Sequence, residues 1–185
     1  MGKSAATRAR LQREALQLFA DRGYDETTVA DIAAAAGVTQ MTFFRYFPAK
    51  ELVVVDDPYD PAIAHAVAVQ PPGLPVVERV RRGLLAAWTQ LEDADHAEFR
   101  RRLQIGAGHR GLRARMRENN QRTEAAIAAA LTDRGVPGFE AVVAAGAVIG
   151  ALTAALLEWA NDPDAGPMGD AVTAALALLE IRPRR

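Results

Sequence analysis

Apolar residues in this chain of 185 residues recur at helical spacing, in segments that proline and glycine interrupt. In the first such segment, residues 5–22, Leu11, Ala15, Leu18 and Phe19 fall on one face of a helix. No segment shows the strict alternation of apolar and polar residues that is typical of a half-buried strand. Half of the residues are apolar, which suits a globular protein with a substantial core. The sequence therefore predicts an all-α fold.

The order of helices and breakers predicts two domains. We expect further helices near residues 28–37, 39–47, 48–55, 61–69, 75–92, 96–105, 113–134, 139–161 and 168–180, with a glycine-rich loop at 106–111. The run Asp56-Asp57-Pro58 marks a boundary, because the residue before a proline disfavours helix. The predicted domains are residues 1–55 and 58–185.

Two of these helices are short and are joined by a tight turn at Gly37. Thr28 and Thr39 are placed to cap them, since a threonine oxygen can accept a hydrogen bond from the first turn. Phe43 and Phe47 are four residues apart, so they share a face and should pack onto the first helix. A unit of this kind can place its second helix in the major groove of DNA.

The face that the two phenylalanines leave free carries groups suited to nucleic acid. Glutamine can pair with adenine, arginine can pair with guanine or hold a phosphate, and threonine or methionine can contact a thymine methyl. Threonine, tyrosine and lysine near the helix ends are suited to phosphates. The candidate DNA-binding residues are Thr28, Thr39, Gln40, Met41, Thr42, Arg45, Tyr46 and Lys50. The alternative is a helical hairpin with an ordinary solvated face.

The charge balance permits such a partner. The whole chain has a formal net charge of −1, but residues 1–50 hold seven basic and five acidic residues, a local excess of about two positive charges. The arginines of residues 100–102 and 113–117 lie among acids. We expect most of them to be solvated or paired, with one able to bridge to the DNA-binding domain.

Catalytic chemistry has little support. The chain has no cysteine, and its only serine is Ser4, so the two commonest covalent nucleophiles are absent from any folded site. Its three histidines are scattered without metal-ligand spacing. We therefore expect no enzyme, no metal and no cofactor.

The run from Thr28 to Leu52 resembles the N-terminal domain of TetR-family transcriptional regulators. The matching elements are the first helix with Gly23-Tyr24, the start Thr27-Thr28-Val29, Ile32-Ala33, Gly37-Val38, and Tyr46-Phe47 followed by Lys50-Glu51. The resemblance implies a three-helix helix-turn-helix domain, followed by a helical half that dimerises and binds a small-molecule effector. Two positions depart from the family pattern. Met41 replaces a residue that is often small, and Phe44 replaces a frequent tyrosine, so the usual phosphate donor at that position is lost.

The family pattern gives no residue-level guide to the C-terminal half. Five large apolar residues could line an effector cavity between the central helices: Trp88, Phe99, Leu103, Met116 and Trp159. Each could equally be an ordinary core residue. Few polar groups share their helix faces, which favours a hydrophobic or aromatic effector.

The predicted homodimer interface uses the last two helices. Gly146 and Gly150 share a face that would let another helix approach closely, and Val172 and Leu176 form a stripe on the final helix. The alternative is dense packing within one subunit. Residues 141–157 form an uncharged run near the lower limit of about 17 residues for a membrane span. Their small side chains and missing flanking anchors favour a buried helix and no membrane contact.

These patterns predict a ligand-responsive DNA-binding regulator. We expect a repressor that acts as a homodimer on a double-stranded DNA operator and is released by a small hydrophobic effector. The polar N-terminus lacks a secretory segment, so the expected location is the cytoplasm. The alternative function is an all-α ligand-binding or scaffold protein that does not bind DNA.

Overall fold

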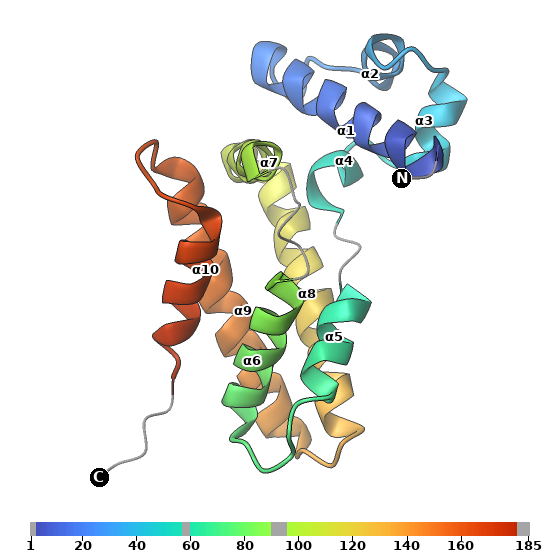
Figure 1. Cartoon of the computed structure of the whole chain (residues 1–185). Coiled ribbons are helices and arrows are strands. Elements are labelled where there is room, and N and C mark those ends of the chain that lie inside the picture. The colour runs from blue at the N-terminus through green and yellow to red at the C-terminus, as the bar shows by residue number, and fades with distance from the viewer. Residues whose placement is uncertain (1–2, 57–59, 90–95, 181–185) are drawn as a thin grey trace. The chain divides into compact units, whose positions relative to one another are not determined.

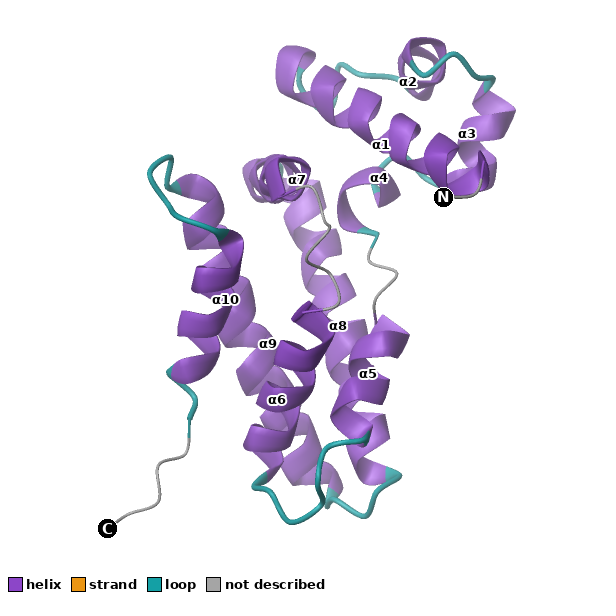
Figure 2. Cartoon of the chain, in the orientation of Figure 1, coloured by secondary structure: helices purple, strands orange, loops and turns teal. Residues whose placement is uncertain are grey.

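The computed structural model describes residues 3–56, 60–89 and 96–180. This part of the chain consists of helices and loops and contains no strand (Figures 1 and 2). The predicted all-α fold is confirmed. The helices are α1 (Lys3–Arg22), α2 (Val29–Ala35), α3 (Gln40–Tyr46), α4 (Leu52–Val55), α5 (Asp60–Ala68), α6 (Val76–Thr89), α7 (His96–Gly108), α8 (Arg110–Thr132), α9 (Gly138–Asn161) and α10 (Met168–Ala177).

The chain folds into two compact units. Unit 1 comprises Met1–Asp56 and Asp95–Met116, and unit 2 comprises Asp57–Ala94 and Arg117–Arg185. The first change of unit falls at the Asp56-Asp57-Pro58 run. Residues 95–116, which lie within the predicted domain 58–185, pack with the N-terminal segment instead. Helix α8 therefore begins in unit 1 and continues in unit 2.

Unit 1 has its own hydrophobic core. Helix α1 contributes one apolar stripe, and α7 and the start of α8 cover the same core from residues 95–116. The buried members are Leu11, Ala15, Leu16, Phe19, Ile32, Ala36, Phe43, Phe47, Val53, Val54, Val55 and Leu112. Polar bonds add to this packing, because Arg102 of α7 donates to the carbonyls of Val54 (3.0 Å) and Asp56 (2.8 Å). One arginine of the 100–102 run thus joins the N-terminal segment, as the sequence suggested.

The connection between α7 and α8 differs from the prediction of a loop at 106–111. Helix α7 continues to Gly108 and α8 starts at Arg110, so only His109 lies outside a helix. The ring Nδ1 of His109 accepts the N–H of Leu112 at 3.2 Å and so caps α8. Gly106 is buried where a Cβ atom would lie only 2.4 Å from the Met116 sulfur. This glycine permits close packing within a helix and does not end it.

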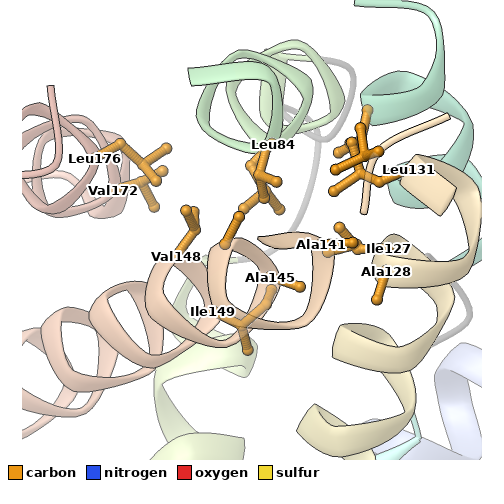
Figure 3. Close-up of a cluster of buried hydrophobic side chains, with 14 residues drawn as sticks. Leu84, Ile127, Ala128, Leu131, Ala141, Ala145, Val148, Ile149, Val172 and Leu176 are labelled. Atoms are coloured by element: carbon orange, nitrogen blue, oxygen red, sulfur yellow. The ribbon is translucent and has the colours of Figure 1, made fainter. Parts of the chain in front are cut away.

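The core of unit 2 is formed by α5, α6, α8, α9 and α10. In Figure 3, side chains from α6, α8, α9 and α10 point toward one another around Val148 and Ala145. Helix α5 packs closely on α6, since a Cβ atom on Gly83 would lie 2.6 Å from the Cα of Val67. This contact fixes the spacing of the α5–α6 pair.

Helix α9 is the most apolar element of unit 2. By length and composition it could cross a membrane, and a third of its most apolar 18-residue segment is buried in the structure. Its buried residues, which include Ala141, Ala145, Val148 and Ile149, belong to the core of unit 2. The remaining face is exposed and includes large apolar side chains.

Candidate DNA-binding site

Helices α2 and α3 form a helix-turn-helix whose inner face is buried. Ile32, Phe43 and Phe47 are all 0% exposed, and the two phenylalanine rings lie 5.8 Å apart between centroids. The turn is made by Gly37, whose φ of +63° is a conformation that glycine adopts without strain. Its N–H donates to the carbonyl of Ala34 at 3.0 Å. The helix-turn-helix prediction is therefore confirmed in its geometry.

Each of the two short helices begins at a threonine cap. The Thr28 hydroxyl accepts the N–H of Asp31, whose carboxylate accepts the N–H of Thr28, which completes a capping box. The Thr39 hydroxyl accepts the N–H of Thr42 at 3.2 Å, and their hydroxyl oxygens lie 3.1 Å apart. Isolated helices of this length are marginal in water. The caps and the buried Phe43 therefore hold α3 in place.

The outer face of α3 presents the predicted recognition residues. Gln40, Met41 and Arg45 are exposed, with Met41 at 83%, and Thr42 is half-buried. Phe44, which stands where the family often has tyrosine, is 47% exposed and has its ring edge-on to Phe43. It offers an apolar surface and no hydroxyl. The face is thus a mixture of one amide, one guanidinium and apolar groups.

Tyr46 closes the C-terminal end of this face. Its ring lies beneath the Arg45 guanidinium, 5.1 Å from centroid to Cζ. A hydrogen bond from Ser4, with a further one from Arg45, lowers the pKa of the Tyr46 hydroxyl. The start of α1 is therefore adjacent to the end of α3, which gathers several hydroxyl groups beside one arginine.

The two other predicted phosphate anchors already have partners in the chain. The Thr28 hydroxyl donates to Asp31 at 2.5 Å, and this bond lowers the pKa of the Asp31 carboxyl. The Lys50 ammonium donates to the carbonyls of Tyr24 (2.8 Å) and Thr27 (3.0 Å), and it lies 4.1 Å from the Tyr24 ring centroid. Both side chains therefore hold the start of α2 in place in this structure.

A cluster around Tyr24 supports the α1–α2 turn and was missed in the sequence. The His109 ring packs against Tyr24 with its centroid 4.8 Å away and its plane tilted by 50°, and His109 Nε2 lies 3.2 Å from both carboxylate oxygens of Asp25. Burial, with added repulsion from Glu51 and Asp25, raises the pKa of Tyr24 to about 12. No local spacing could reveal this cluster, because 84 residues separate Asp25 from His109.

The five predicted effector-pocket residues are divided between the two units. Phe99 and Leu103 on α7 and Met116 on α8 belong to unit 1, whereas Trp88 and Trp159 belong to unit 2. The division arises because α7 packs with α1 and α4. Met116 packs against the unit 1 core, and Trp88 packs against the core of unit 2. Trp159 donates from Nε1 to the carbonyl of Gly166 at 2.9 Å and lines an open groove of about 600 Å³ between α9 and α10.

The four predicted dimer residues also separate into two pairs. Val172 and Leu176 are 1% and 0% exposed and pack in the core of unit 2 (Figure 3), so they offer no surface to a second subunit. The stripe on α10 that the sequence showed is the inward face of that helix. Gly150 is exposed with open space around it, and Gly146 is half-buried with only the Glu124 carboxylate near its Cβ position.

A capped helix-turn-helix with an exposed, mixed polar and apolar second helix defines a DNA-binding protein. Residues 12–55 match the family model of bacterial regulatory proteins of the tetR family, and residues 74–183 match the model of the MftR C-terminal domain. The chain belongs to the TetR family of DNA-binding transcriptional regulators.

Two curated relatives are transcriptional regulators. TcmR of Streptomyces glaucescens is 45% identical over 73 residues, which cover 38% of this chain and 32% of TcmR. MftR of Mycobacterium tuberculosis, a mycofactocin biosynthesis transcriptional regulator, is 27% identical over 96 residues, 49% of this chain and 46% of MftR. The chain thus spans about a third and about half of the length of these relatives.

A solved structure agrees in fold along nearly the whole chain. The complex of triclosan with SmeT, the repressor of the Stenotrophomonas maltophilia multidrug efflux pump SmeDEF, superposes with a TM-score of 0.62. It shares 20% sequence identity and covers 94% of this chain and 90% of SmeT. Helix order and architecture are therefore those of the family.

Proposed function

We propose that this protein is a ligand-responsive repressor that binds a double-stranded DNA operator through α3 and leaves it when a small hydrophobic effector binds. The observation that carries DNA binding is the two-sided character of α3. Phe43 and Phe47 bury one side completely, and Gln40 and Arg45 project from the other. The proposed role is regulation in the cytoplasm, with no catalytic step.

In the proposed complex each recognition helix reads one half-site. Gln40 and Arg45 are the hydrogen-bonding candidates for base edges, and Met41 and Thr42 contribute apolar contact to thymine methyls. Tyr46 and the N–H groups at the capped start of α3 suit phosphates. Thr28, Lys50 and Tyr46 all have intramolecular hydrogen-bond partners, so each would have to exchange or share a partner when it binds a phosphate.

A homodimer is supported by the exposed side of α9. Phe139, Val143, Ala147, Gly150 and Ala154 follow one another at spacings of three or four residues, and all are exposed. Phe139 is 82% exposed and Val143 52%. The stripe continues into the groove that Ala154 and the 87%-exposed Leu178 of α10 help to line. A continuous stripe of exposed apolar residues is typical of an interaction site, and we propose a second copy as the partner.

A dimer sets the geometry of operator binding. Two recognition helices must enter successive major grooves about 34–36 Å apart. An effector that binds better to a dimer with another spacing would shift the population away from the operator-bound form. We propose that the effector binds in unit 2, and the triclosan complex of SmeT, a protein of the same fold, supports a hydrophobic ligand.

The test of the proposed function is direct binding to DNA. Purified protein is titrated into labelled DNA from the promoter region of its own gene, and affinity is measured from low to physiological salt. We expect specific binding whose logarithm falls linearly with the logarithm of the salt concentration. Binding to no DNA, or binding that salt does not affect, would favour an all-α ligand-binding or scaffold protein instead.

A further inference from the structure

Arg79 of α6 is a buried guanidinium without a counter-charge in the described part of the chain. Its side chain is 3% exposed, and its Nε has no hydrogen-bond partner there. Among the described residues, no carboxylate lies within ion-pair distance of it. An arginine does not lose its proton, so burial leaves a full positive charge in the interior of unit 2.

The nearest carboxylate along the helix, that of Glu78, is already paired with other arginines. Both oxygens of Glu78 accept from Arg81, at 2.7 Å from Nε and 2.7 Å from Nη2, and Arg82 Nε adds a third bond at 2.5 Å. These bonds lower the pKa of Glu78 to about 2, so it remains ionised and bound to its neighbours. The segment 78–82 therefore has three arginines and one carboxylate.

Helix position adds to the positive potential around Arg79. Its N–H makes the first bond of α6, to the carbonyl of Pro75 at 3.0 Å, so the residue lies in the first turn. The free N–H groups of a first turn favour anions. A buried and uncompensated charge in such a place is unfavourable unless an anion is supplied from outside the chain.

We propose that Arg79 binds the anionic group of the effector, which is therefore an apolar molecule with one carboxylate or phosphate. The unpartnered Nε and its neighbouring Nη form the same two-donor edge that Arg81 presents to Glu78 in this protein. The neighbours Val76, Val77 and Val80 belong to the apolar core or pack against it. They favour a hydrophobic body on the ligand. The inference rests on the proposed ligand-responsive function and adds the charge of the ligand to it.

The test compares probes that differ only in the head group. Octanoate, octyl phosphate and octan-1-ol are titrated calorimetrically into the full chain and into the variants Arg79→Gln and Arg79→Lys. The control Arg117→Gln removes one exposed positive charge elsewhere in unit 2. We expect the wild type and the control to bind one of the anions at least about tenfold more tightly than octan-1-ol. Arg79→Gln should bind all three alike, and Arg79→Lys should lie between. The preferred anion shows whether the head group is a carboxylate or a phosphate.

Two results would overturn the inference. The wild type could bind the anions no better than the alcohol, or Arg79→Gln could keep the preference. Operator binding of each variant is measured in the same preparations and should not change. Loss of DNA binding by the wild type would refute the proposed function alone, since the anion preference is measured without DNA.

Discussion

At the scale of single residues, side chains near the recognition helix differ in how much of their bonding capacity the fold already uses. Lys50 makes two bonds to carbonyls and covers an aromatic ring, and Thr28 is bound to Asp31. Arg45 is exposed, and its guanidinium lies over the ring of its neighbour Tyr46. We therefore expect substitutions at these positions to separate into effects on stability and effects on DNA binding.

Replacing Arg45 should weaken operator binding without destabilising the fold. We expect Arg45→Ala to lower operator affinity by about 1–3 kcal/mol, because a base or phosphate contact is lost. Its melting temperature should match that of the wild type, since the side chain is exposed. Fluorescence anisotropy with labelled operator measures the first quantity and thermal unfolding the second. Arg134→Ala, at an exposed site in unit 2, is the control. Unchanged affinity in both Arg45→Ala and Tyr46→Phe would mean that another face reads the DNA.

Replacing Lys50 should mainly destabilise the fold. We expect Lys50→Met to lower the free energy of unfolding by about 1–3 kcal/mol, because two charge-assisted bonds to carbonyls are lost. Urea unfolding monitored by circular dichroism measures the change, with the exposed Arg10→Met as the control. A variant of full stability that binds DNA poorly would instead show that Lys50 is chiefly a phosphate contact.

The ionisation of Glu78 should make the free energy of unfolding depend on pH in the acid range. Its pKa of about 2 in the folded protein lies below its ordinary value of 4.5, so the ion pair contributes fully above pH 4.5 and is lost as the pH falls toward 2. We expect this group to account for about 1 kcal/mol of the stability lost between about pH 6 and 3.5, discounted because Arg82 is half exposed. Glu78→Gln should lack that part of the loss in urea titrations, and the exposed Glu26→Gln should retain it.

At the scale of helices, most of the fold could be predicted from the sequence because local signals determine it. The signals in the helix-turn-helix act over only a few residues each. The caps Thr28 and Thr39, the turn at Gly37 and the buried face of Phe43 and Phe47 could therefore be predicted. The continuation of α7 to Gly108 could not be predicted. Gly106 suggested that the helix ends there, whereas a glycine is needed at this position because the Met116 sulfur of another helix packs against it.

Contacts between segments far apart in the chain account for the other differences. The stripe of Val172 and Leu176 was correctly recognised as apolar, but periodicity cannot say whether such a face meets its own subunit or another. The large apolar residues proposed for one pocket fall into two units for the same reason. The His109 contact with Asp25 has no local signature at all.

Gly83 should be essential to the α5–α6 pair. A Cβ atom there would lie 2.5–2.7 Å from atoms of Val67, two of them backbone atoms that cannot rotate away. We expect Gly83→Ala to lower the free energy of unfolding by about 1–3 kcal/mol, despite the better helix propensity of alanine. The comparison is Gly169→Ala, where the nearest atom is at an ordinary 3.5 Å. Equal stability of the two variants in urea unfolding would contradict this packing.

At the scale of the whole molecule, we propose that the exposed stripe of α9 is the interface through which two copies of the chain associate. We expect Val143→Glu to weaken self-association at least about 100-fold, because a carboxylate would be buried without a partner in the interface. Sedimentation equilibrium measures the change, and Ala125→Glu at an exposed site on α8 is the matched control. A Val143→Glu protein that remains dimeric would place the interface elsewhere.

The membership of residues 95–116 in unit 1 limits how such regulators can be recombined. A hybrid made by a single crossover after Asp56 would give the N-terminal helices a foreign α7. It would lack the bonds from Arg102 to the carbonyls of Val54 and Asp56, and it would lack His109 beside Asp25. Such a hybrid would split unit 1 between two parents, because this folded unit is encoded in two separate stretches of the sequence. Exchange of operator specificity between relatives should succeed more often when residues 95–116 travel with the first 56, as a two-segment graft.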